Sequence, residues 1–283
     1  MILFKNPNDL QLYLAKQRKQ GKKTGFIPTM GALHKGHVSL IQASKKSGNL
    51  TVCSIFVNPT QFNDPSDFAK YPVTLEKDIG ILITESCDIL FLPSVQDMYP
   101  GGTALSRHYD LGYLDTILEG KYRPGHFQGV VTIVHHLLEI IRPDHLYIGQ
   151  KDYQQCMVIK KLISITGSEN LITLHISPTL REPGGLAMSS RNVRLDEKSR
   201  KKAPVIFQTL QFIKDHIKKG DLIPLKNEAI RTLTSNDFEV DYIEIADAIT
   251  LQSVDLWDGE QKIVALVAAY LNGVRLIDNI LLN

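Results

Sequence analysis

The stretch "GFIPTMGALHKGHVSLIQASKKSGNLTVCSIFV", residues 25–57, decides the fold class. It opens with a short apolar run at 25–28 and closes with a second at 51–57, and such runs ended by Pro or Asn-Pro are typical of buried strands. Residues 36–48 carry apolar side chains at helical spacing and end at Gly48, as a helix does. A strand, a helix and a second strand in this order are the unit from which parallel sheets are built.

The same alternation continues to about residue 180. Apolar periodicity predicts helices over 74–87, 129–143 and 153–166, and strands over 88–93, 145–149 and 171–178. We therefore expect a doubly wound, Rossmann-like α/β domain over residues 1–182.

The pattern changes in the last hundred residues. A long amphipathic helix is predicted over 196–220, followed by strands over 239–247, 262–271 and 274–282. Asn272–Gly273 separates the last two strands, and Asn-Gly between apolar runs is a strong hairpin signal. We expect a smaller α+β domain over residues 183–283.

Composition excludes several classes of protein. The formal net charge of +2 gives no electrostatic reason to expect nucleic acid or a membrane surface as a partner. The N-terminus turns polar after four residues, and no apolar run reaches the length of a membrane span. Cys53, Cys87 and Cys156 lie among apolar neighbours, which favours buried thiols in a reducing compartment. We expect a cytoplasmic protein.

The loop "PTMGALHKGH", residues 28–37, is the first candidate site. It leaves a predicted strand at its carboxyl end and enters a helix, where backbone N–H groups and the helix dipole favour anions. His34 and His37 would share one face of the first turn, and Gly36 would let a phosphate approach the backbone. The same pair could also be structural or bind a metal. No P-loop motif is present.

Two further loops carry phosphate-binding chemistry. "GLAMSSRN", residues 185–192, offers two hydroxyls and an arginine fork. "IGQKDYQQ", residues 148–155, offers Lys151 for phosphate, Asp152 as a helix cap and two neutral amides for a polar substrate. Neither loop needs to bind a phosphate. Residues 185–192 could be an ordinary Ser-Ser-Arg loop, and residues 148–155 could be a capped helix with a solvated lysine.

Taken together, these stretches resemble one family. "PTMGALHKGH", "FVNPTQF" (56–62), "YRPGHFQGVVTIV" (122–134), "RPDHLYIGQKDYQQ" (142–155) and "REPGGLAMSSRN" (181–192) occur in the order found in the pantoate–β-alanine ligases. That family belongs to the nucleotidyltransferases with HIGH-type and KMSKS-like motifs. The resemblance implies condensation of (R)-pantoate with β-alanine to pantothenate through a pantoyl adenylate. ATP, together with Mg²⁺, would be the third substrate, AMP and pyrophosphate would leave, and the protein would be a homodimer.

The resemblance also assigns residues. It implies pantoate binding by Asn58, Gln61 and Gln155, and β-alanine binding by Gln61 and Arg123. Catalytic roles fall to His34, His37, Lys151, Ser189, Ser190 and Arg191. Asp78 is a candidate aid to Mg²⁺ binding. ATP contacts are implied for Met30, Gly31, Ala32, Leu33, His34, Lys35, Gly36, His37, Gly149, Gln150, Lys151, Asp152, Leu180, Met188, Ser189, Ser190 and Arg191.

The chain departs from the family pattern at several positions. Val73 stands in place of a usual Arg, His136 in place of Lys, Gly184 in place of Asp, and residues 101–110 match poorly. Two other functions are alternatives: a nucleotidyltransferase that makes a stable nucleotide product, and a metal or nucleotide sensor that uses the histidines.

Overall fold

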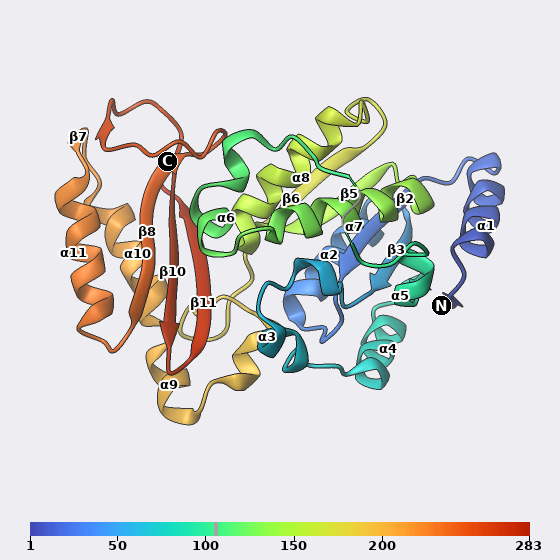
Figure 1. The fold of residues 1–283 in the computed structure, drawn as a ribbon, viewed down its shortest axis with the longest axis horizontal. Coiled ribbons are helices and arrows are strands. Elements are labelled where there is room, and N and C mark those ends of the chain that lie inside the picture. Colours follow the sequence, from blue (N-terminus) through green and yellow to red (C-terminus); the bar gives the residue numbers. More distant parts are fainter. Residues whose placement is uncertain (105–106) are drawn as a thin grey trace. The chain divides into compact units, whose positions relative to one another are not determined.

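The computed structural model describes residues 1–104 and 107–283, so Leu105 and Ser106 of the poorly matching segment lie outside the described residues. The chain folds as two compact units (Figure 1). The first comprises Met1–Gly149 and Val158–Pro178, and the second comprises Gln150–Met157 and Thr179–Asn283. The boundary after residue 182 stays a prediction.

The first unit is built on a six-stranded sheet in which all paired strands are parallel. The order across the sheet is β1 (Ile2–Phe4), β4 (Ile89–Phe91), β3 (Leu50–Ile55), β2 (Thr24–Thr29), β5 (His145–Gly149) and β6 (Thr173–Ser177). The predicted Rossmann-like class is confirmed, and the opening stretch forms β2, a helix and β3 as expected.

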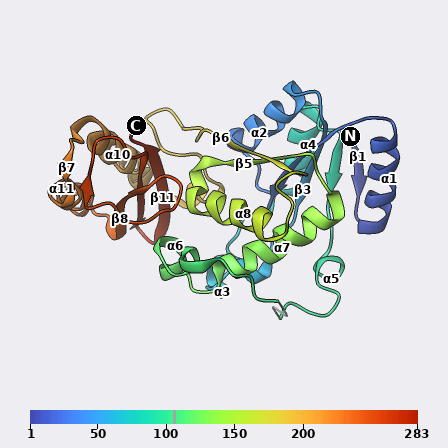
Figure 2. The ribbon, with the colours of Figure 1, turned by 90° about the horizontal axis from the view of Figure 1, so that it is seen from above.

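Helices cover both faces of this sheet (Figure 2). On one face α2 (Lys35–Lys46) and α4 (Leu75–Thr84) bury Leu40, Ile41 and Leu82 against Ile27 and Leu90 of the strands. On the other, α7 (His126–Ile141) packs on β2 and on α1 (Pro7–Lys19). The remaining elements that begin in this unit are η1 (Pro59–Gln61), α3 (Pro65–Ala69), α5 (Val95–Met98), η2 (Gly112–Asp115) and α6 (Leu118–Tyr122).

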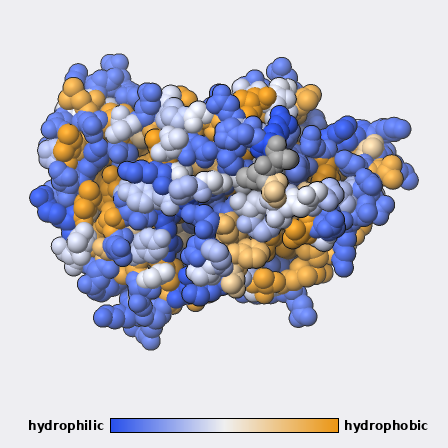
Figure 3. Space-filling view, in the orientation of Figure 1, coloured by the Kyte–Doolittle hydropathy of each residue, from blue (hydrophilic) through white to orange (hydrophobic). Residues whose placement is uncertain are grey.

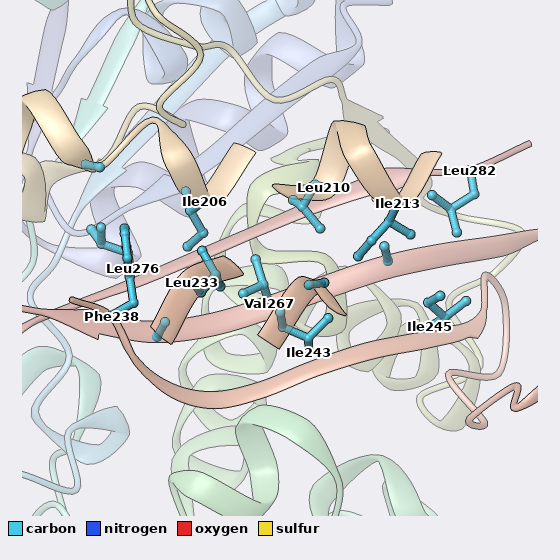
Figure 4. Packing of buried hydrophobic residues seen from close by; sticks show 14 of the residues in the cluster. Ile206, Leu210, Ile213, Leu233, Phe238, Ile243, Ile245, Val267, Leu276 and Leu282 are labelled. Atoms are coloured by element: carbon cyan, nitrogen blue, oxygen red, sulfur yellow. The ribbon is translucent and has the colours of Figure 1, made fainter. Parts of the chain in front are cut away.

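The second unit is an antiparallel sheet covered on one face by helices. Its strand order is β11 (Val274–Leu281), β10 (Ile263–Leu271) and β8 (Glu239–Asp247). Figure 4 shows side chains of α10 (Val205–His216) and α11 (Ile223–Thr234) packed onto the strands. The shorter elements are η3 (Gln150–Asp152), η4 (Ser190–Arg194), α9 (Glu197–Lys202), β7 (Gly220–Asp221) and β9 (Leu256–Trp257), and α8 (Tyr153–Ile165) runs from this unit into the first.

The predicted hairpin is confirmed, because Asn272 and Gly273 adopt φ of +48° and +73° between β10 and β11. The single long helix predicted over 196–220 is wrong. α9 ends at Lys202 and α10 begins at Val205, since Pro204 has no N–H to continue the first helix and starts the next. Helices α1 and α11 were not predicted.

On the face seen in Figure 3, hydrophilic residues predominate and hydrophobic ones are interspersed. Among the described residues, every helix is too short or too polar to cross a bilayer.

Candidate active site

The sheet has a topological switch point between β2 and β5. β2 is followed along the chain by β3 on one side, whereas its neighbour on the other side is β5. In open parallel sheets, ligands bind outside the carboxyl ends of the strands at such a point. The candidate histidine loop follows β2, and Gly149 ends β5.

His34 and His37 are brought together at the start of α2. His34 is the N-cap, and its Nδ1 accepts a hydrogen bond from the Gly36 N–H at 3.1 Å. The Nδ1 of His37 accepts from the His34 N–H at 3.3 Å, and the ring centroids are 4.1 Å apart. An imidazole whose Nδ1 accepts carries its proton on Nε2 when it is neutral. Each ring, when neutral, therefore has an N–H donor at Nε2, a group of the kind that binds phosphate oxygens.

A buried carboxylate holds the loop that leads to these histidines. Asp78 of α4 is 1% exposed, and its two oxygens accept hydrogen bonds from the Ala32 N–H at 2.9 Å and the Leu33 N–H at 2.8 Å. The Thr74 hydroxyl donates to the same carboxylate at 3.1 Å. These contacts give Asp78 a structural task, which the sequence did not indicate. Its role toward Mg²⁺ stays a prediction.

The held loop has an unusual backbone. Gly31 and Ala32 both have positive φ, +80° and +49°, and a side chain at Gly31 would begin 3.1 Å from an Asp78 oxygen. Two consecutive left-handed residues are unfavourable for all but glycine. The carboxylate compensates by satisfying the two N–H groups that this conformation turns inward.

Asn58 is the centre of a buried hydrogen-bond network. Its Nδ2 donates to Gln61 Oε1 at 3.1 Å and to the Gly129 carbonyl at 3.2 Å. Its Oδ1 accepts from the Tyr99 hydroxyl at 2.7 Å and from the Thr60 hydroxyl at 3.0 Å. With its side chain fully used in this way, Asn58 orients Gln61. Direct contact between Asn58 and pantoate stays a prediction.

Gln61 lies between Met30 of the histidine loop and the side chain of His126. Gln61 Nε2 is 3.2 Å from the Met30 sulfur, and its backbone carbonyl is 2.8 Å from Nδ1 of His126. The Nε2 of His126 is 3.2 Å from an Arg123 guanidinium nitrogen, and Arg123 is 3.5 Å from Glu119. The structure thus links Gln61 to Arg123, the two predicted β-alanine residues, through His126.

The network also contains His126, Tyr99 and Gly129, which are not among the predicted site residues. His126 and Gly129 stand inside the family motif "YRPGHFQGVVTIV", where the resemblance implies a role for Arg123 alone. Nothing in the sequence signals Tyr99, because its partner Asn58 is 41 residues away.

In the second unit, the predicted residues that follow β5 form η3 and the first turn of α8. Lys151 is half-buried, and its Nζ is 3.3 Å from Asp152 Oδ1. The backbone carbonyls of Gln150 and Lys151 accept hydrogen bonds from the Asn279 side chain. Gln155 is half-buried.

The second unit also holds the predicted loop Met188 to Arg191. The Met188 N–H donates to the Leu180 carbonyl at 2.9 Å, so these two predicted ATP residues lie side by side. Ser189 caps η4, with its hydroxyl accepting from the Arg191 N–H at 3.2 Å. All four loop residues are half-buried.

Comparison with known proteins matches the whole chain to one family. The family model described as pantoate-beta-alanine ligase matches residues 2–281. The pantothenate synthetase of Cytophaga hutchinsonii is 43% identical over 285 residues, covering 100% of this chain and 99% of that protein. That of Christiangramia forsetii is 41% identical over 285 residues, covering 100% of both chains.

Solved structures agree. The crystal structure of pantothenate synthetase from Thermus thermophilus superposes with a TM-score of 0.90 at 36% identity, covering 99% of each chain. Pantoate-beta-alanine ligase from Francisella tularensis, complexed with beta-gamma ATP and beta-alanine, gives 0.81 at 39% identity, covering 99% of this chain and 97% of its own. The chain described here belongs to the pantoate–β-alanine ligase family.

Proposed function

We propose that this protein condenses (R)-pantoate with β-alanine to form pantothenate, using ATP. The pantoate carboxylate attacks the α-phosphorus of ATP, and pyrophosphate leaves. The amine of β-alanine then attacks the acyl carbon of the pantoyl adenylate and loses a proton, and AMP leaves. The Francisella tularensis ligase, crystallised with an ATP ligand and β-alanine, supports the same two ligands here.

The observation that carries the proposal is the contact between the histidine loop and the amide network. Gln61, oriented by Asn58, lies 3.2 Å from the sulfur of Met30, which stands in the loop that ends at the His34 cap. A hydroxy-acid held by the amide would lie beside a phosphate chain held by the loop. Such placement turns a reaction between two anions into one between positioned neighbours.

The chemistry of the candidate residues suits this reaction. Carboxylate and triphosphate repel each other, and Nε2–H donors of His34 and His37 would offset that charge as it grows. We assign Lys151, Ser189, Ser190 and Arg191 to the same task. Neutral amides at Gln61 and Gln155 can orient pantoate without competing for its charge.

We assign no nucleophile to the protein. Cys53, Cys87 and Cys156 are buried, and burial raises the pKa of each thiol. A buried thiol with a raised pKa carries little of the reactive thiolate.

Mg²⁺ would enter with ATP as part of the substrate. Within the residues that the structure describes, no group of three or more His, Cys, Asp and Glu side chains could hold a metal ion. Mg²⁺ commonly keeps several waters and binds substrate phosphates with few protein ligands, which fits this donor set. We further propose a homodimer, a cytoplasmic location and a lid role for residues 183–283, on the family resemblance.

Pyrophosphate release from Mg-ATP tests the function directly. With pantoate alone, we expect a single-turnover burst, and with β-alanine added, sustained release together with AMP. Sustained release without an amine, with a stable nucleotide product, would support the other nucleotidyltransferases. Folded protein that releases no pyrophosphate under either condition would overturn the ligase.

A further inference from the structure

Two adjacent residues of β11, Asp278 and Asn279, are polar and almost fully buried, each 2% exposed. Successive side chains of a strand point to opposite faces of its sheet. The remainder of β11 is largely apolar, with Leu276 and Val274 in the core under α10 and α11. Buried polar groups at such positions persist when they are fully hydrogen-bonded.

Asn279 binds the backbone of η3. Its Nδ2 donates to the Gln150 carbonyl at 2.9 Å and to the Lys151 carbonyl at 2.8 Å. Its Oδ1 accepts from Gln150 Nε2 at 3.2 Å. One side chain thus fixes both peptide groups that flank Lys151, the proposed phosphate-binding lysine.

Asp278 binds the other nucleotide segment through Arg181. Its two oxygens lie 2.5 and 3.0 Å from the two terminal nitrogens of the Arg181 guanidinium, which also stacks 3.6 Å from the centre of the Phe207 ring of α10. Arg181 donates to the Gly185 carbonyl at 3.0 Å and pairs across a short bridge with Ala187. The residue after Ala187 is Met188, where the Ser-Ser-Arg loop begins.

We propose that Asp278 and Asn279 are positioning residues for ATP, holding the Lys151 segment and the Met188–Arg191 segment on opposite faces of one strand. Both segments are then attached to adjacent residues of β11. The strand therefore determines the distance between them. The inference rests on the proposed function for the meaning of the two segments, but the holding contacts can be measured separately.

The variant Asn279→Asp tests whether Asn279 positions the Lys151 segment. It keeps the shape of the side chain, removes the two donated hydrogen bonds and places an anionic oxygen against two carbonyls. We expect the KM for ATP to rise about tenfold with the KM for β-alanine unchanged, because two hydrogen bonds that hold the lysine segment are lost. A merely structural role would lower thermal stability and leave the KM for ATP alone.

Asn283→Asp is the matched control. Asn283 also bridges backbone groups, at the start of β10, accepting from the Ile263 N–H and donating to the Gln261 carbonyl, both at 2.9 Å. We expect it to lower stability without changing the KM for ATP.

Arg181→Lys tests whether Arg181 positions the Met188–Arg191 segment, since lysine keeps the charge but loses the fork and the ring stacking. Arg275→Lys changes a comparable ion pair, to Asp241 at 2.7 Å, and is its control. Amide hydrogen exchange should become faster over 180–191 in Arg181→Lys and over 150–153 in Asn279→Asp, and should stay slow in both controls.

The outcomes separate the inference from the function. An active wild-type enzyme with unchanged ATP KM and exchange in Asn279→Asp and Arg181→Lys would overturn the positioning role and leave the ligase intact. A wild-type protein that releases no pyrophosphate would overturn the ligase. In that case unchanged exchange in both variants still contradicts the holding role, and faster exchange still supports it.

Discussion

At the scale of single residues, buried polar side chains shape the site by binding backbone, as Asp78 does for Ala32 and Leu33. This carboxylate accepts hydrogen bonds from two N–H groups and from the Thr74 hydroxyl, and hydrogen bonds to an ionised group are roughly twice as strong as those between neutral groups. Gly31 and Ala32 both have positive φ, which is unfavourable for alanine. The hydrogen bonds to Asp78 stabilise the loop in this conformation.

Asp78→Asn removes one acceptor and turns an NH₂ group toward a backbone donor. We expect the free energy of unfolding to fall by about 1–3 kcal/mol, since a buried donor is left unsatisfied. We also expect the KM for ATP to rise. Urea unfolding and steady-state kinetics measure the two effects. Glu76→Gln, at an exposed carboxylate in the same helix turn, is the control and should change neither by much.

A histidine pair in the first unit predicts a pH dependence. Nδ1 of His145 and Nε2 of His175 are 3.1 Å apart, and the Tyr147 ring stacks on His175 at 4.5 Å. Burial, and then the neighbouring His145, lower the pKa of His175 below its ordinary value. The folded state therefore binds fewer protons than the unfolded chain, and stability present above the unfolded pKa is lost as the pH falls.

His175→Gln should flatten that dependence. We expect the urea midpoint of the wild type to drop more between about pH 7.5 and pH 5 than that of the variant. The difference between the two drops is the pH-dependent stability that His175 contributes. An equal drop in both proteins would show that the pair does not resist protonation.

At the scale of elements, helix α7 approaches η1 so closely that one position allows only glycine. A Cβ at Gly129 would lie 2.2 Å from the Thr60 carbonyl oxygen and 2.7 Å from the Gln61 nitrogen. Because these are backbone atoms, they cannot rotate away. The close approach lets the Gly129 carbonyl reach Asn58.

Gly129→Ala and Gly80→Ala form a matched pair of helical substitutions. The first should destabilise the protein by about 1–3 kcal/mol through overpacking and raise the KM for pantoate as Gln61 moves. The second, in an exposed turn of α4 with no atom within 4 Å of the new methyl group, should stabilise by about 0.5–1 kcal/mol. Thermal unfolding of both variants checks the opposite signs.

At the scale of the whole molecule, local pattern predicted the strand–helix alternation and the Asn272–Gly273 hairpin, because both depend on neighbours in the chain. It placed His34 and His37 on one helix turn for the same reason. It could not predict Asp78 on the Ala32 amide, which is 46 residues away, or Asp278 on Arg181, which is 97 residues away. Such partners follow from strand order and packing, not from spacing.

The three thiols give a prediction for the intact protein. All are at most 1% exposed, and burial raises the pKa of Cys87 to about 11 and that of Cys53 well above its ordinary value. We expect no thiol to react with an aromatic disulfide reagent at about pH 8 within minutes, and all three to react in denaturant. A thiol titrated rapidly in the native state would contradict the buried arrangement.

The hairpin turn that joins β10 to β11 is also a site where the stored protein can be chemically modified. An asparagine followed by glycine is prone to deamidation, because the small glycine lets its backbone nitrogen attack the side-chain amide. The Asn272 amide donates to Asp196 Oδ2 at 2.8 Å, at the cap of α9. Deamidation would replace the Asn272 amide by a carboxylate beside Asp196. We therefore expect stored protein to lose this hydrogen bond and to become more acidic.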